Sequence, residues 1–213
     1  PTAEIYIDTT ADKASVNEVT VASNTIQATV SPGGANIRIK EKRGTNRPPG
    51  LWAISGNIIG SQEHNVHLTG CYGMTLSGNC IYSCGKRNLL IEESSQINAS
   101  GNVFRRHTPT MGTGIRLVNS SDIVLQGCTV LDEAEAGQST KASLLEISKC
   151  ERINVSGGQF LDGVPYGIDV EHSSQVQIAN CTISERRSQP LQTAAIRFRG
   201  SGSLNQIAHN VLS

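Results

Sequence analysis

The sequence predicts an all-β solenoid, in which about eight similar coils stack along one axis. Three observations lead to this fold class. One motif recurs along nearly the whole chain, and a second short strand pattern lies between its copies. In addition, the 213 residues include 21 glycines and only 4% aromatic residues, as expected for many short strands joined by tight turns.

The recurring motif reads apolar-x-apolar-x-x-Asn-x-apolar. Its copies are Val19–Ile26, Trp52–Ile59, Met74–Ile81, Ile97–Phe104, Ile123–Val130, Ile153–Phe160 and Val176–Ile183, with an imperfect last copy at Asn205–Leu212. The copies recur every 22 to 33 residues or so, roughly the repeat length of a solenoid. Alternation with a period of two predicts a strand with one inward face before the Asn, and the apolar residue after the Asn marks a further strand.

A second strand, of the form apolar-x-apolar, lies between successive copies. It occurs at Ile5–Ile7, Ile37–Ile39, Val66–Leu68, Leu89–Ile91, Ile115–Leu117, Leu145–Ile147, Ile168–Val170 and Ile196–Phe198. Each coil is therefore expected to hold two strands and a short third one.

The Asn position of the motif predicts a stacked ladder. Down the copies this position reads Asn24, Asn57, Asn79, Asn102, Cys128, Gly158, Cys181 and Asn210. Asparagine tolerates the backbone of a sharp turn, and its amide can bond to an equivalent amide one coil away. We therefore expect a partial asparagine ladder, interrupted in three coils.

These features resemble the right-handed parallel β-helix superfamily. The resemblance is carried by the Ser-Gly-Asn turn with its following apolar residue and by the GIxL-type strands at Gly114–Leu117 and Gly167–Val170. The superfamily includes pectate lyase-like and other polysaccharide-active repeat proteins. The resemblance spans about residues 3 to 212 and implies one right-handed parallel β-helix domain over residues 1–213. It also implies a polysaccharide or glycan partner and an extracellular or cell-envelope location.

Charge and composition argue against other partners. Eighteen basic residues balance eighteen acidic ones, and no apolar stretch approaches the length of a membrane span. We therefore expect neither a nucleic acid nor a membrane as partner. Because the chain begins and ends close to predicted strands, we expect a piece of a longer protein, capped by further coils or by another chain. The basic segment 40–50 is expected to be an exposed insertion loop.

The outward position of the second strand gives the catalytic candidates. Down the coils it reads Arg38, His67, Leu90, Arg116, Glu146, Asp169 and Arg197. Stacked strands lie about 4.8 Å apart, so Glu146 and Asp169 should be neighbours, close to the carboxylate separation of retaining glycosidases. A lyase would instead need cations and a base near the sugar. The catalytic candidates are Glu146, Asp169, Arg116, Arg197 and His107, and the candidates for substrate binding are Arg105, Arg106, Tyr166, Glu171 and His172.

Linkers of unequal length are expected to wall a cleft on the side that follows the Asn strand. They are Gly60–Asn65, Tyr82–Asn88, Arg105–Gly114, Leu131–Ser143, Leu161–Gly167 and Ser184–Ala194.

The function expected from these features is that of a polysaccharide lyase, a glycoside hydrolase or a glycan-binding protein. Two alternatives remain open: the outward charges form a solvated cross-strand ladder, and the solenoid is purely structural or adhesive.

The sequence contains no metal-binding motif. The six cysteines lack the spacing of a zinc site, although Cys80 and Cys84 are near enough in sequence to bridge a turn. Calcium is conceivable at Asp132, Glu133 and Glu135, but these residues lack the regular spacing of a calcium loop. The cofactor is therefore left unknown.

Overall fold

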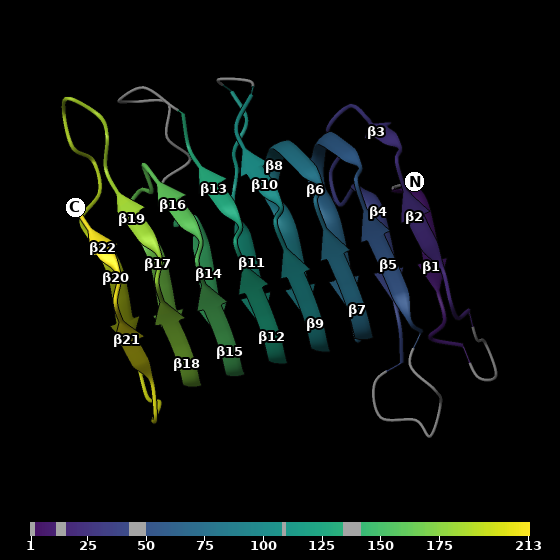
Figure 1. Ribbon diagram of the computed structural model, residues 1–213. Helices are drawn as coiled ribbons and strands as arrows, with labels where there is room; N and C mark the ends of the chain where they lie inside the picture. The colour runs from purple at the N-terminus through teal and green to yellow at the C-terminus, as the bar shows by residue number, and fades with distance from the viewer. Residues whose placement is uncertain (1–2, 12–15, 43–49, 108–109, 134–141) are drawn as a thin grey trace.

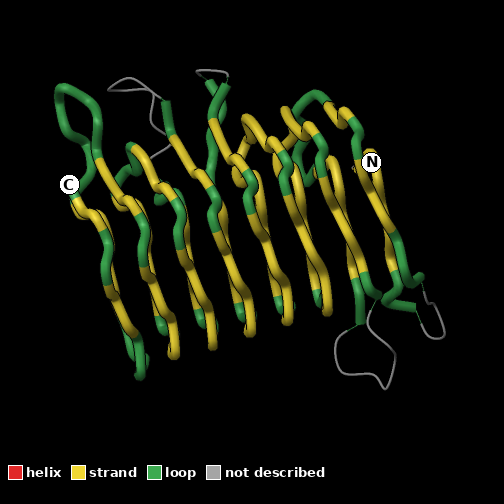
Figure 2. The backbone as a smooth tube through the Cα atoms, in the orientation of Figure 1, coloured by secondary structure: helices red, strands yellow, loops and turns green. Residues whose placement is uncertain are grey.

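The computed structural model is a parallel β-solenoid. It describes residues 3–11, 16–42, 50–107, 110–133 and 142–213. The coils lie side by side along one axis, with the N-terminal coil at one end and the C-terminal coil at the other (Figure 1). The described residues contain strands, turns and loops and no helix (Figure 2). The predicted all-β class is confirmed.

Two parallel sheets make up the stack. The eight-stranded sheet consists, in spatial order, of β2 (Thr20–Ala22), β5 (Trp52–Ser55), β7 (Tyr72–Ser77), β9 (Ser95–Ser100), β12 (Ser121–Gln126), β15 (Glu151–Ser156), β18 (Ser174–Ala179) and β21 (Gln206–Ala208). The 14-stranded sheet holds the other two strands of each coil. One set is β1 (Ala3–Asp8), β4 (Ala35–Lys40), β11 (Ile115–Val118), β14 (Leu145–Ser148), β17 (Tyr166–Glu171) and β20 (Ala194–Arg199). The other set is β3 (Thr25–Gln27), β10 (Val103–Arg105), β13 (Thr129–Leu131), β16 (Gln159–Leu161), β19 (Thr182–Ser184) and β22 (Val211–Leu212).

Two long strands join both sets of the 14-stranded sheet. They are β6 (Ile58–Thr69) and β8 (Cys80–Glu92), and their register shifts once, between Gln62 and His64. The prediction that 60–65 and 82–88 are loops is therefore wrong, because these segments pair with each other as strand. In later coils the corresponding segments do leave the sheet, as after β16 and β19.

The predicted number of coils is slightly high for the stacked body. About six coils, those that contain β5, β7, β9, β12, β15 and β18, have a neighbouring coil on both sides. The count of eight is reached only with the two end coils, which pair on one side. The C-terminal coil leaves apolar side chains exposed, among them Ile207 and Val211.

The core follows the predicted inward columns. Ile59, Ile81, Phe104, Val130 and Phe160 stack after the Asn turn and are almost fully buried. Burial of each such side chain contributes about 1.5–3 kcal/mol to stability. Most of these inward positions hold an Ile, Leu or Val side chain, which accounts for the low aromatic content.

The asparagine ladder is confirmed over four coils. The Oδ1 atom of Asn57 accepts hydrogen bonds from the backbone N–H and the amide of Asn24, at 3.0 and 3.1 Å. Asn79 accepts from Asn57 in the same way, and Asn102 accepts from Asn79. Each amide group also donates to a backbone carbonyl, as from Asn79 to Ile54. These bonds fix the register of the turns.

A second polar column was not predicted from the sequence. It lies at the turn before the eight-stranded sheet, where the Ser94 and Ser120 hydroxyls accept backbone N–H groups of the preceding coil, from Cys71 and Ser94. The Ser173 hydroxyl accepts from Cys150 in the same manner. At this turn, serine hydroxyls therefore accept the backbone N–H groups, as the asparagine amides do at the other turn.

All six cysteines are free thiols, so Cys80 and Cys84 do not bridge. Five are buried, and burial raises the pKa of the Cys84 thiol to about 12. Burial also raises the pKa of Cys128, Cys150 and Cys181. These buried thiols are packing groups and not nucleophiles. Within the described residues, no helix is long and apolar enough to cross a membrane.

A groove over the first four coils

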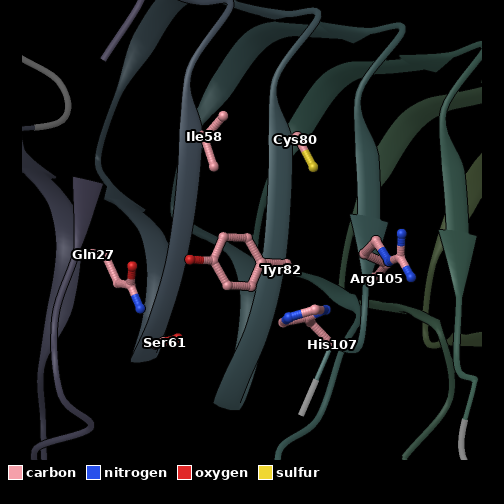
Figure 3. Close-up of a pocket in the computed structure, with 7 residues that line it drawn as sticks. All are labelled: Gln27, Ile58, Ser61, Cys80, Tyr82, Arg105 and His107. Carbon is pink, nitrogen blue, oxygen red and sulfur yellow. The ribbon is translucent and has the colours of Figure 1, made fainter. Parts of the chain in front are cut away.

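The 14-stranded sheet carries a groove on its outer side, over the first four coils. It is lined by Gln27, Ile58, Ser61, Cys80, Tyr82, Arg105 and His107, which belong to β3, β6, β8, β10 and the segment after β10 (Figure 3). Its volume is about 500 Å³, within the range of small-ligand sites. The lining residues from four successive coils make the groove run across the strands, along the axis of the solenoid.

Tyr82 forms the floor of this groove. In the close-up its ring lies in the middle of the seven residues, with Gln27 on one side and Arg105 on the other (Figure 3). The ring covers Gly60 of the neighbouring coil, where a Cβ atom would stand only 2.3 Å from the Tyr82 Cζ atom. Gly60 therefore leaves the space that Tyr82 occupies.

His107 and Arg105 form one side of the groove. The His107 ring packs edge-on against Tyr82, with the ring centroids 5.8 Å apart. The backbone N–H of His107 donates to the Ser83 hydroxyl at 2.9 Å, which fixes the segment after β10. The exposed guanidinium of Arg105 pairs with Glu133 at 2.6 Å. Two predicted site residues thus lie together here, but away from the predicted carboxylates.

Arg106 has a different environment from Arg105. It is almost fully buried and pairs with the equally buried Asp132, at 2.7 Å between Nε and Oδ1. A side chain held in this way contributes to the packing of the loops after β10 and β13, and its guanidinium is shielded from a ligand in the groove. Of the possible calcium ligands, Asp132 and Glu133 are engaged by arginines, and Glu135 lies outside the described residues. No group of three or more metal-ligating side chains occurs among the residues described.

The four charged catalytic candidates line up across β11, β14, β17 and β20, as predicted. Arg116 is the register partner of Glu146, Glu146 of Asp169, and Asp169 of Arg197. Each carboxylate is paired with arginines. Glu146 accepts from Arg87 at 2.5 Å and lies 3.6 Å from Arg116, while Asp169 accepts two hydrogen bonds from Arg197, at 2.9 and 2.7 Å. This pattern is the cross-strand charge ladder that the sequence left open as an alternative.

Tyr166 and Arg197 complete this ladder. The Arg197 guanidinium lies 4.0 Å from the centroid of the Tyr166 ring and donates to its hydroxyl at 2.9 Å. The hydrogen bonds to Asp169 raise the pKa of Arg197 above its ordinary value. Glu171 pairs with Arg199, and exposed His172 contacts Ser201, both at the end of the same sheet. These residues interact with one another and lie several coils away from the groove.

A histidine pair lies on β6, with His64 buried and His67 half-buried, in the same row of strands as the charge ladder. The rings of His64 and His67 are 5.4 Å apart, and Glu92 contacts the Nε2 atom of His67 at 2.7 Å. Burial, and then the neighbouring His67, lower the pKa of His64 from 6.5 to about 4.

This shift predicts a loss of stability in acid. Unfolded His64 takes up a proton near pH 6.5, whereas the folded protein resists protonation until about pH 4. Above pH 6.5 His64 is neutral in both states and costs no stability. As the pH falls to 4, the free energy of unfolding decreases by up to about 3 kcal/mol, because only the unfolded state takes up the proton. Urea unfolding at pH 7.5 and 4.5 measures it, and His64→Gln should lose less stability on acidification than the parent. An equal loss in both proteins would contradict the assignment.

The family model described as right handed beta helix region matches residues 35–212. The chain belongs to the right-handed β-helix family. This membership confirms the right-handed β-helix that the resemblance implied. No curated protein matches this β-helix protein in sequence.

Solved structures show the same fold at low identity. The enzymatically active domain of tailspike protein 2 from bacteriophage CBA120 superposes with a TM-score of 0.61 at 14% identity, over 91% of this chain and 37% of the tailspike chain. The full-length tailspike protein 2 from an Escherichia coli O157:H7 bacteriophage also gives 0.61, at 15% identity, over 88% and 31%. The β-helix protein thus spans about a third of these tailspikes. The mannuronan C-5 epimerase A-module of Azotobacter vinelandii gives only 0.40, at 13% identity over 84% of this chain and 65% of that one.

Proposed function

We propose that this β-helix protein binds a polysaccharide in the groove over coils one to four. The observation that carries the proposal is the Tyr82 ring, which is supported by Gly60 and lies within a groove with polar sides. A flat aromatic ring supplies the apolar surface on which a sugar ring stacks. Gln27, Ser61 and Arg105 supply hydrogen-bonding groups around it, in the pattern of few polar groups beside an apolar floor.

The direction and length of the groove fit an extended glycan. Successive coils lie about 4.8 Å apart, so the four coils span about 14 Å from the first to the last. This length suits a short stretch of an extended glycan that runs along the solenoid axis. The phage origin of the tailspike neighbours adds no residue-level support, because their identities of 14% and 15% concern the fold alone.

A glycan screen tests this proposal. The protein would be titrated with neutral and uronic acid-containing polysaccharides, with and without calcium, and both tyrosine fluorescence and the appearance of unsaturated or reducing ends would be measured. Saturable binding to one glycan class supports the proposal. The absence of binding across the panel would favour the structural or adhesive solenoid instead.

A catalytic role of the charge ladder is tested separately. Because Glu146 and Asp169 are held by arginines, we expect Glu146→Gln with Asp169→Asn to lower the free energy of unfolding by about 2 kcal/mol and to leave glycan binding unchanged. Unfolding in urea and titration with the glycan measure the two effects. Loss of glycan cleavage at unchanged stability would instead assign the two carboxylates to the chemistry.

A further inference from the structure

Two columns of outward residues on the eight-stranded sheet carry no charge, and we call these two columns together the amide-hydroxyl face. One column is Thr20, Ala53, Thr75, Asn98, Val124, Asn154, Gln177 and Gln206, and the other is Ala22, Ser55, Ser77, Ser100, Gln126, Ser156, Ala179 and Ala208. The equivalent columns on the strands of the charge ladder carry charged residues at most positions. The two sides of the solenoid therefore differ in chemistry.

The side chains of this face repeat in register from coil to coil. The Asn154 amide donates to Gln177 at 2.8 Å, and the Gln177 amide donates to Gln206 at 3.2 Å. Parallel, in-register columns of small and amide side chains are the elements that let two β-sheets mate closely through a dry interface. Small residues such as Ser77 and Ser100 leave room for the side chains of an opposing sheet.

The borders of the face also permit close approach. On one side, several successive turns carry a glycine with a positive φ, such as Gly78 and Gly101, and a glycine projects no side chain. On the other side, Asp122 of β12 and the exposed Glu151 and Arg152 of β15 form ion pairs, and they make up a charged rim beside the two columns. A charged polymer would find no opposite charge within the two columns, and a glycan would find no aromatic ring in them. A second copy of the same uncharged face meets neither obstacle.

We propose that two copies of this protein pair face to face through the amide-hydroxyl face. The contact is isologous, since the same surface serves both copies. Eight strands at about 4.8 Å, each with two outward residues, give about 500 Å² for each copy and about 1,000 Å² in total. This total lies below the roughly 1,200–2,000 Å² of stable complexes and in the range of weak, transient ones, so we expect a weak dimer that forms only as the protein concentration rises.

Sedimentation equilibrium between about 1 and 100 µM tests the pairing. The parent is expected to shift from its monomer mass of 22.7 kDa to twice that mass as the concentration rises. Ser100→Arg places two like charges in the interface and should raise the dissociation constant at least tenfold. The matched control is Ser148→Arg, which adds the same side chain on β14 of the other sheet and should leave pairing unchanged.

Two outcomes would overturn the pairing. One is a parent that stays monomeric throughout the concentration range, which needs no variant to interpret. The other is a dimer that survives Ser100→Arg or that Ser148→Arg dissociates. Tyr82→Ala should still dimerise, because the groove and the amide-hydroxyl face belong to different sheets.

Discussion

Replacement of Tyr82 by alanine is expected to weaken glycan binding at least 30-fold. The ring is the floor of the groove, and loss of a central aromatic contact costs about 2 kcal/mol or more. Titration of parent and variant with the glycan that binds in the screen measures the effect. Unfolding curves would show that the variant stays folded, since the Tyr82 side chain lies on the outer side of the sheet.

Two further variants separate stacking from a general loss of a tyrosine. Tyr72→Ala removes an exposed tyrosine from β7, in the other sheet, and should bind as the parent does. Gly60→Ala keeps the Tyr82 ring but places a methyl group where the ring lies, so it should also weaken binding. Parent-like affinity of both Tyr82→Ala and Gly60→Ala would place the glycan elsewhere.

Replacement of Asn79 by alanine is expected to lower the free energy of unfolding by about 4 kcal/mol. The change leaves the backbone N–H and the amide of Asn57 and the carbonyl of Ile54 without their partner, all of them in the interior. Each buried polar group left unpaired costs about 1–3 kcal/mol. Chemical denaturation of parent and variant measures the difference.

Asn24→Ala provides the control for the ladder. Asn24 is the first member, is exposed, and donates to Asn57 without accepting from a ladder residue before it. Its replacement should cost less than half as much as that of Asn79. Equal costs would mean that the ladder contributes through turn conformation alone and not through its buried hydrogen bonds.

The sequence is sufficient to predict the fold because one motif controls both the direction of side chains and the register of coils. Alternation directs Ile81 and Phe104 inward, and the Asn position aligns the turns, so the sequence alone places Glu146 and Asp169 side by side. The stacking spacing predicts Arg116 and Arg197 as neighbours of these carboxylates, but it does not reveal every partner. Arg87, which pairs with Glu146, reaches it from β8, two coils away in the stack.

The side on which the groove lies was predicted, since Ser61, Tyr82, Arg105 and His107 belong to the linkers expected to wall a cleft, but its floor of paired strands was not. The segments after Ile59 and Ile81 vary in length and lack a clear motif, which is typical of loops. In the structure, however, they pair with each other as parts of β6 and β8. A usable signal was present at Gly60. It occupies an outward position that holds Gln27, Tyr82 and Arg105 in the neighbouring coils, and a glycine there leaves space for a large neighbour.

The groove connects the first coil to the three coils that follow it. Gln27 lies on the first coil, whose strands have a neighbour on one side only, while His107 follows the fourth coil. A glycan that contacts both residues would connect segments about 80 residues apart in sequence, and it would oppose local opening of the first coil. Hydrogen exchange of β2 and β3 would then slow upon binding, although neither strand gains a covalent restraint.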